Sequence, residues 1–352
     1  MTTGRGITLD CIIFGLQRFG GISNYWAQIV GGVVAEPRLA CSLVVPNPVQ
    51  FRELDGTWIG RALPIQEKID ARYARYLRSN VGHLRDVFHT SYYRRPNRKV
   101  GKFVVTAYDF TYERYRSGLA RLVHTRQKQA SIRAANAVLC ISEATRRDVI
   151  EFCPDVDVAK LHVVHLAADP NAFFKGDSDA PRSNEQTVLF VGQRGTYKRF
   201  DLAIDAVRQS SRLKLGVVGP ALDSGERATL QRALGDRWHE FGPVSTTELR
   251  SLYASSFALV FPSDYEGFGL PVLEAMACGC PVVAAATSSL PEVGGQAALY
   301  PSDQSGEAYA GALRCLESSA ERDRAVDAGL RRATEFSWSQ TVDKTIAVYL
   351  ND

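Results

Sequence analysis

The sequence predicts an α/β protein made of two Rossmann-like domains, each with a parallel sheet. Three observations lead to this prediction. Short apolar runs are followed by glycine-containing turns and then by amphipathic helices, which is the order found in parallel sheets. A polar segment at 169–186 interrupts this pattern, which then begins again. The length of 352 residues is also typical of about two domains.

The composition is that of an ordinary globular protein. Hydrophobic residues make up 45% of the chain, enough for two sizeable cores. The net charge of +4 implies neither nucleic-acid nor membrane binding by itself. The seven cysteines are scattered and lie mostly in apolar segments, so we expect reduced, buried thiols in a cytoplasmic protein. No apolar run approaches the ~20 residues of a membrane span, and the N-terminus lacks the apolar core of a signal peptide.

We assign residues 1–168 to the first domain. It is expected to open with a strand at 7–16, a turn at Gly20 and Gly21, and a helix at 22–36. A Gly-Gly pair is a weak signal, so a plain turn is an equally good interpretation of these two glycines. Further strands are expected at 40–45, 86–89, 103–109, 137–142 and 161–169.

Residues 66–133 of the first domain are rich in Lys and Arg. Arg72, Arg75 and Arg78 follow one another at three-residue spacing, which places them close together on a helix. One interpretation is a solvated charged face. The other is a surface for a lipid-linked acceptor or for an anionic membrane.

Residues 169–186 are predicted to be a linker, and residues 187–335 the second domain. Asp177-Ser-Asp179 imitates a metal-binding motif, but that motif belongs at the end of a strand, so we expect no metal there. The strand at 187–191 precedes a glycine-rich loop bracketed by Arg194 and Lys198. Two cations at the carboxyl end of a strand suit the charge of a leaving diphosphate; plain surface charge is the alternative.

The most informative stretch is 257–279. It predicts a buried strand at 257–261, a loop containing Gly267 and Gly269, and a helix with Pro271 in its first turn. The backbone N–H groups of Gly269 and Leu270 would then form an anion site at the N-terminus of the helix.

Two carboxylates flank this anion site, Glu266 in the loop and Glu274 in the helix. An anion site beside two hydrogen-bond acceptors suits a nucleotide sugar. The alternative is a capped helix after a buried strand, with both carboxylates on a solvated face.

The spacing Glu266-x7-Glu274 around Gly-Phe-Gly-Leu-Pro resembles the signature of the retaining glycosyltransferases of family four, which have the GT-B fold. The resemblance implies two domains facing a cleft, with the donor on the second domain and the acceptor on the first. It also implies that the C-terminal helix, residues 336–352, crosses back to the first domain.

The resemblance further assigns roles to residues. Glu274 would accept hydrogen bonds from the donor ribose, Glu266 would contact the transferred sugar, and Arg194 and Lys198 would bind the β-phosphate. Many family members have His-Asp where this chain has Tyr108-Asp109, so Asp109 is a candidate near the reacting centre, and Tyr108 is a core aromatic or a sign of a different donor sugar. The remaining donor-binding candidates are backbone groups or turn residues: Gly21, Gly192, Gly219, Val244, Phe268, Gly269 and Leu270.

We therefore expect a retaining, metal-independent glycosyltransferase without a cofactor. Its phosphate loop is similar to those of bacterial mannosyltransferases, which favours GDP-mannose or a related GDP-sugar as donor. The acceptor would be a glycan or a lipid-linked glycan of a surface polysaccharide such as O-antigen, capsule or exopolysaccharide. The alternatives are a non-catalytic subunit that binds a nucleotide sugar, and a transferase for a UDP- or dTDP-6-deoxy sugar. We expect a cytoplasmic protein, with peripheral contact to the inner face of the membrane as a hypothesis and no nucleic-acid partner.

Overall fold

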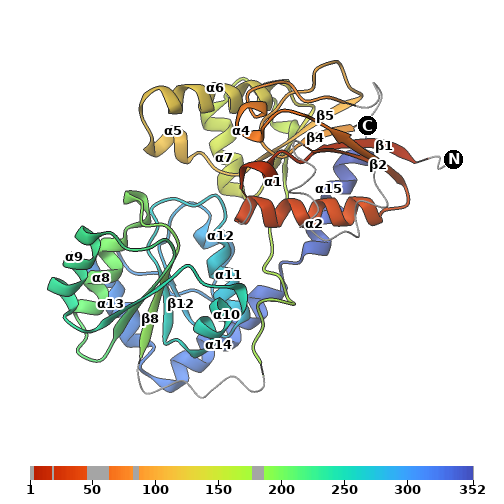
Figure 1. The fold of residues 1–352 in the computed structure, drawn as a ribbon. Helices are drawn as coiled ribbons and strands as arrows, with labels where there is room; N and C mark the ends of the chain where they lie inside the picture. The colour runs from red at the N-terminus through yellow and green to blue at the C-terminus, as the bar shows by residue number, and fades with distance from the viewer. Residues whose placement is uncertain (1–3, 18–19, 46–62, 82–86, 177–185, 352) are drawn as a thin grey trace. The chain divides into compact units, whose positions relative to one another are not determined.

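The computed structural model describes residues 4–17, 20–45, 63–81, 87–176 and 186–351. The chain divides into two compact units (Figure 1): the first is Met1–Leu166 with Trp338–Asp352, and the second is Ala167–Ser337. Asp177-Ser-Asp179 and half of the expected linker, residues 177–185, lie outside the described residues. The two α/β units have the expected parallel sheets and helical connections, so the predicted fold class is confirmed.

The first unit contains a seven-stranded parallel sheet in the order β3-β2-β1-β4-β5-β6-β7. The strand order changes direction at β1, which pairs with both β2 and β4, so the carboxyl ends of β1 and β4 lie at a switch point where α/β proteins place ligands. The strands are β1 (Arg5–Asp10), β2 (Leu39–Val45), β3 (Leu63–Gln66), β4 (Val87–Thr90), β5 (Lys102–Ala107), β6 (Ala137–Cys140) and β7 (Leu161–Val163).

The helices of the first unit are α1 (Ile13–Leu16), α2 (Gly21–Ala35), α4 (Ala71–Ala74), α5 (Thr111–Tyr115), α6 (Gly118–Ala134), α7 (Glu143–Phe152) and α15 (Trp338–Leu350), with a 3₁₀ turn η1 (Val158–Lys160). The prediction of one strand over 7–16 is wrong: the strand ends at Asp10, and α1 follows. There the Ile13 N–H donates to Ser91 Oγ at 3.0 Å, which takes the chain out of the sheet.

The C-terminal helix α15 returns to the first unit, as predicted, and packs on α2. Gly32 makes the close approach possible, since a Cβ there would lie 2.3 Å from Val342 Cγ1. The Tyr349 hydroxyl meets His89 Nδ1 at 2.6 Å inside the core. Arg5 and Lys102 donate to carbonyls at the end of α15, where cations complement the helix dipole.

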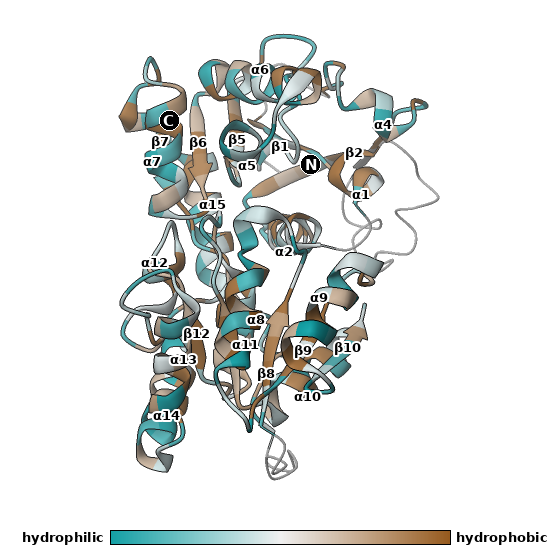
Figure 2. Cartoon of the chain, turned by 90° about the vertical axis from the view of Figure 1, so that its left-hand side faces the viewer, coloured by the Kyte–Doolittle hydropathy of each residue, from teal (hydrophilic) through white to brown (hydrophobic). Residues whose placement is uncertain are grey.

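The second unit contains a five-stranded parallel sheet in the order β10-β9-β8-β11-β12. In Figure 2 the strands of this sheet are largely hydrophobic, and the helices around the sheet carry many hydrophilic residues. The strands are β8 (Thr187–Val191), β9 (Lys214–Val218), β10 (Trp238–Gly242), β11 (Ala258–Phe261) and β12 (Val282–Ala284). The helices are α8 (Phe200–Arg208), α9 (Ser224–Leu234), α10 (Thr246–Ser255), α11 (Leu270–Ala277), α12 (Leu290–Gly294), α13 (Gly306–Cys315) and α14 (Ser319–Thr334), with a 3₁₀ turn η2 (Thr196–Lys198).

All seven cysteines are free thiols, and all but Cys315 are buried, as expected from their apolar surroundings. Within the described ranges, none of the helices combines the length and the apolar composition needed to cross a bilayer.

Candidate active site

The candidate site lies at the carboxyl ends of the strands of the second unit. Two of its predicted residues, Gly192 after β8 and Gly219 after β9, are brought together by strand pairing. The Gly192 N–H donates to the Val218 carbonyl at 2.9 Å, and the Gly219 N–H donates to the Gly242 carbonyl at 3.0 Å. Both glycines have positive φ, 129° and 145°. A Cβ at Gly219 would lie 2.4 Å from the Gly192 carbonyl oxygen, so only glycine allows the two loops that follow β8 and β9 to approach this closely.

We expect Gly219→Ala to destabilise the protein by roughly 2–3 kcal/mol, because it adds backbone strain to a clash with a main-chain carbonyl. Denaturant unfolding would measure the loss. Gly225→Ala, in the exposed first turn of α9, is the control and should be neutral or slightly stabilising. Equal stability of the two variants would show that the approach of Gly219 to Gly192 is not constrained in this way.

Lys198 and Glu266, both predicted as catalytic residues, form a direct ion pair. The Lys198 Nζ lies 2.5 Å from Glu266 Oε1, and the two side chains are only 16% and 12% exposed. The rings of Tyr197 and Phe261 lie 5.3 and 5.5 Å from the ammonium group. Lys198 reaches this place from η2 after β8, and Glu266 from the loop after β11. The ion pair and the two rings hold the ammonium group in a fixed position.

Arg194 is held by a residue that the sequence analysis missed. Its Nε donates to Glu226 Oε1 at 2.7 Å, and its Nη2 donates to Glu226 Oε2 at 3.2 Å and to the Ala221 carbonyl at 2.9 Å. The hydrogen bonds from Arg194 lower the pKa of Glu226. The third guanidinium nitrogen, Nη1, is buried and has no hydrogen-bond partner among the described residues. A buried donor without an acceptor is costly unless a ligand supplies one.

Glu226 also caps the helix that carries it. Its Oε2 accepts from the Asp223 N–H at 2.9 Å, and Asp223 Oδ1 accepts from the Glu226 N–H at 2.8 Å, which together form a capping box. The pattern Asp223-x-x-Glu226 was visible in the sequence as a helix start. Its second role, 32 residues from Arg194, had no local signal.

The loop before α11 presents two backbone donors. Gly269 is the N-cap residue with φ 100°, and a Cβ there would lie 2.7 Å from Leu290 Cδ2. In the described part of the chain, the N–H groups of Gly269 and Leu270 have no protein acceptor. They form the predicted pair of amides at a helix N-terminus.

A buried serine at the start of α12 holds this loop in place. Ser289 is fully buried, and its hydroxyl contacts the carbonyl groups of Glu266 and Phe268 at 3.0 and 2.8 Å. Phe268 is 3% exposed and its ring packs against Phe336, so only its backbone is available for binding.

Glu274 lies half-buried on α11. The Tyr253 hydroxyl donates to its Oε2 at 3.4 Å, and no other side chain in the described residues forms a hydrogen bond with the carboxylate. Burial raises the pKa of Glu274 from 4.5 to about 7, against the lowering effect of Tyr253. The alternative in which both carboxylates lie on a solvated face is therefore wrong. Glu274 is a poorly solvated acceptor with capacity for further hydrogen bonds.

Val244 lies at the end of a neighbouring strand. It is half-buried, follows β10, and precedes Ser245, which caps α10 with Glu248. Its place beside the Gly242 turn is that expected of a base-binding residue.

Tyr108 and Asp109, in the first unit, have structural partners. Tyr108 is buried, accepts a hydrogen bond from Trp26 Nε1, and donates to the Ser91 carbonyl at 3.1 Å, which makes it a core aromatic. Asp109, half-buried after β5, accepts from the Thr111 N–H at 2.9 Å through Oδ1. Gly21 is exposed at the first residue of α2.

Comparison with known proteins agrees with this geometry. Residues 175–332 match the family described as glycosyl transferases group 1. The chain is 32% identical over 252 residues to O-antigen chain mannosyltransferase B of Escherichia coli, which covers 70% of this chain and 60% of that protein. It spans between 50% and 60% of the length of the curated relatives that it matches.

Solved structures share the fold over nearly the whole chain. Sucrose-phosphate synthase from Thermosynechococcus elongatus has a TM-score of 0.76 at 20% identity, covering 98% of both chains. Anabaena Alr3699/HepE, solved in complex with UDP-glucose, has a TM-score of 0.71 at 17% identity, covering 97% of this chain and 98% of that one. The chain therefore has the GT-B fold of these structures, and its residues 175–332 match the family described as glycosyl transferases group 1.

Proposed function

We propose that this protein transfers a hexose, with retention of configuration, from a nucleotide diphosphate sugar to a glycan or lipid-linked glycan of a bacterial surface polysaccharide. The observation that carries this proposal is the set of unsatisfied polar groups at one end of the second sheet. Arg194 Nη1 and the amides of Gly269 and Leu270 have no protein acceptor among the described residues. A diphosphate supplies acceptors for all of them.

The chemistry requires a departing diphosphate and a sugar with oxocarbenium character. Lys198 and Arg194 would stabilise the charge on the leaving group, and each is held in place by a carboxylate, Glu266 or Glu226. Glu266 Oε2, which accepts no hydrogen bond from the described residues, would accept one from a sugar hydroxyl. Glu274 would accept the ribose hydroxyls. The leaving phosphate would take the proton of the acceptor, and no metal is needed for this step.

Two observations favour mannose as the transferred sugar. The phosphate loop, residues 190–200, resembles those of bacterial mannosyltransferases, and a relative at 32% identity is an O-antigen chain mannosyltransferase. The alternative is a UDP-sugar, since HepE was solved in complex with UDP-glucose.

Thermal shift with GDP-, UDP-, dTDP- and ADP-sugars would identify the donor, and GDP-mannose should give the largest shift. Transfer would then be assayed with EDTA present, and the anomeric configuration of the product read by NMR. We expect transfer with retention. If the protein binds a sugar nucleotide but neither transfers the sugar nor hydrolyses the donor, the non-catalytic alternative is favoured. If UDP-glucose gives a larger thermal shift than GDP-mannose, the donor is a UDP-sugar. The absence of any shift would contradict the proposal.

The pKa of Glu274 leads to a pH prediction. Ribose hydroxyls donate to the ionised carboxylate, so binding should be strongest above pH 7 and weaken as the pH falls through about 7, by up to about ten-fold per pH unit. Calorimetry with an intact sugar nucleotide would measure this, because its diphosphate lacks the terminal phosphate that titrates near pH 6.

Glu274→Gln is the matched variant. It keeps the shape of the side chain but removes the charge, so it should bind roughly ten-fold more weakly above pH 7. Its affinity should no longer change with pH in this window. If the Glu274→Gln variant binds with the affinity and the pH dependence of the wild type, Glu274 does not bind the ribose.

A further inference from the structure

Helix α6 in the first unit buries a mostly polar face and exposes an apolar one, which is the reverse of an ordinary surface helix. Its buried residues are mostly polar: His124, Lys128 and Ser131, with Ile132. On the opposite face, at positions i, i+3 and i+4, Leu119, Leu122 and Val123 are exposed, Leu119 by 75%. A surface helix normally buries such an apolar stripe. An exposed one indicates a surface that interacts with a partner or a membrane.

A second segment with the same character includes α4. Tyr73 and Tyr76 are 69% and 57% exposed, and Ile69 and Leu77 are also exposed. Eight of the eleven exposed large hydrophobic side chains among the described residues lie in segments 69–77 and 115–123. The concentration argues against a random scatter of exposed apolar residues.

The two segments lie next to each other (Figure 1). The Gln127 side chain of α6 donates to the Arg75 carbonyl. Tyr92 connects them a second time, since its hydroxyl accepts from Arg75 Nη2 at 3.0 Å and meets His124 Nε2 at 3.1 Å. We call residues 67–78 and 115–127 together the α4–α6 surface.

The α4–α6 surface is strongly basic. Six cations there have no carboxylate partner among the described residues: Lys68, Arg75, Arg78, Arg116, Arg121 and Arg126. Glu67 is buried under the surface, and Asp70, the one other carboxylate in the two ranges, already pairs with Arg72 at 2.8 Å. The exposed apolar and tyrosine side chains suit the boundary between headgroups and acyl chains of a bilayer. The Arg and Lys side chains beside them suit its anionic phosphate groups.

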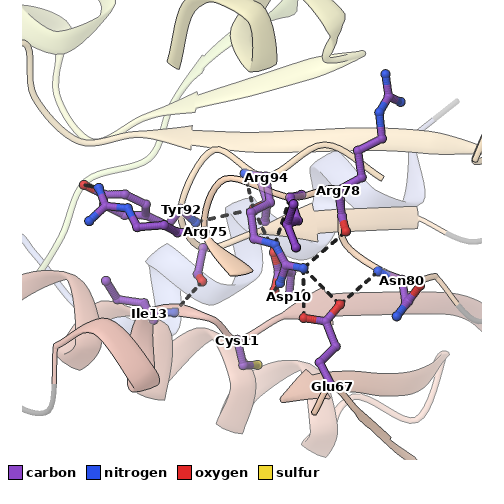
Figure 3. A network of polar contacts seen from close by, with 12 residues as sticks. Asp10, Cys11, Ile13, Glu67, Arg75, Arg78, Asn80, Tyr92 and Arg94 are labelled. Atoms are coloured by element: carbon purple, nitrogen blue, oxygen red, sulfur yellow. Dashed lines mark hydrogen bonds and ion pairs between the residues drawn. The ribbon is translucent and has the colours of Figure 1, made fainter. Parts of the chain in front are cut away.

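A buried charge network supports this surface from below (Figure 3). Arg94 is 1% exposed and donates to Asp10 at 3.0 Å and to Glu67 at 2.8 Å. The same guanidinium donates to the carbonyls of Leu77 and Arg78 at 3.3 and 3.4 Å. The backbone of the α4 segment is therefore fixed to the end of β1, while Tyr73, Tyr76 and Leu77 remain exposed.

We propose that the α4–α6 surface docks this protein on anionic lipid bilayers. Leu119, Leu122, Val123 and the exposed tyrosines enter the interface, and the unpaired cations contact lipid phosphates. This inference does not depend on the proposed transfer activity.

The test is co-sedimentation with phosphatidylcholine vesicles that contain or lack phosphatidylglycerol. The wild-type protein should bind the anionic vesicles, and salt should weaken the binding. Leu119→Glu should lower the affinity at least ten-fold. Arg121→Glu should lower it by about five-fold or more, the effect of losing one basic residue near a charged bilayer. The matched control is Val158→Glu, which makes the same charge change at an exposed residue of η1 and should bind like the wild type.

Three outcomes would overturn the proposal: no binding by the wild type, equal loss in Leu119→Glu and Val158→Glu, or a wild-type dimer by light scattering that Leu119→Glu dissociates. The last would assign the surface to a second copy of the chain. Thermal unfolding and sugar-nucleotide binding, measured on the same variants, report folding and the proposed donor site separately.

Discussion

Lys198→Ala is expected to lower the rate of sugar transfer by about 10²–10³-fold, the usual effect of losing one preorganised charge that stabilises a leaving group. The expected loss is large because the change has two consequences. It removes the ammonium group, and it leaves Glu266, 2.5 Å away, as an uncompensated carboxylate where the diphosphate is proposed to bind. Initial rates with the identified donor would give kcat and KM, and most of the effect should appear in kcat.

The control for Lys198→Ala is Arg208→Ala. Arg208 is in the same unit and pairs with Asp205 at 3.0 Å, but both side chains are about half exposed. Removal of this charge should leave the rate within about two-fold, since exposed ion pairs contribute little. Lys198→Arg should recover part of the rate by keeping the charge. If Lys198→Ala transfers sugar as fast as Arg208→Ala, Lys198 has no role in the chemistry.

Arg94→Leu is expected to destabilise the protein by about 3–5 kcal/mol. Arg94 pairs with both Asp10 and Glu67, and all three side chains are almost completely buried. Removing one partner of a buried ion pair leaves uncompensated charge in a poorly solvated site, which costs far more than the pair itself contributes. Denaturant unfolding at neutral pH would measure the difference.

The same variant should show a pH dependence of defined sign. Burial already raises the pKa of Asp10 from 3.8 to about 6, while Arg94 lowers it. Without Arg94 the folded pKa rises further, so the destabilisation should be larger at pH 8, where Asp10 must ionise, than at pH 5, where it is protonated. The control is Arg72→Leu, because Arg72 forms an exposed pair with Asp70, and its loss should change the stability little at either pH. A similar, pH-independent cost in both variants would contradict this interpretation.

The predictions that depended on local pattern were the most accurate. The stretch 257–279 was predicted as strand, glycine loop and helix, and β11, the Gly269 cap and α11 follow that order. Each of these features depends on interactions within a few residues, which a single sequence contains.

The pairings between distant residues could not be predicted. Arg194, Lys198 and Glu266 were named one by one, but nothing near Lys198 indicates a partner 68 residues away. Glu226 was not named at all; it caps its own helix and also holds Arg194 in place. The basic region at 66–133 left two interpretations open, because charge alone does not show which apolar residues of a helix face outward.

The sequence by itself determined the class of fold, the return of the last helix through its family resemblance, and the residue types of the donor site. Tertiary structure alone decided which charges compensate each other, which donors lack acceptors, and that α6 turns its leucines outward and buries Lys128. The reason is physical: helix and turn signals come from neighbouring residues. Burial and ion pairing are set by strand order, which brings together segments tens of residues apart.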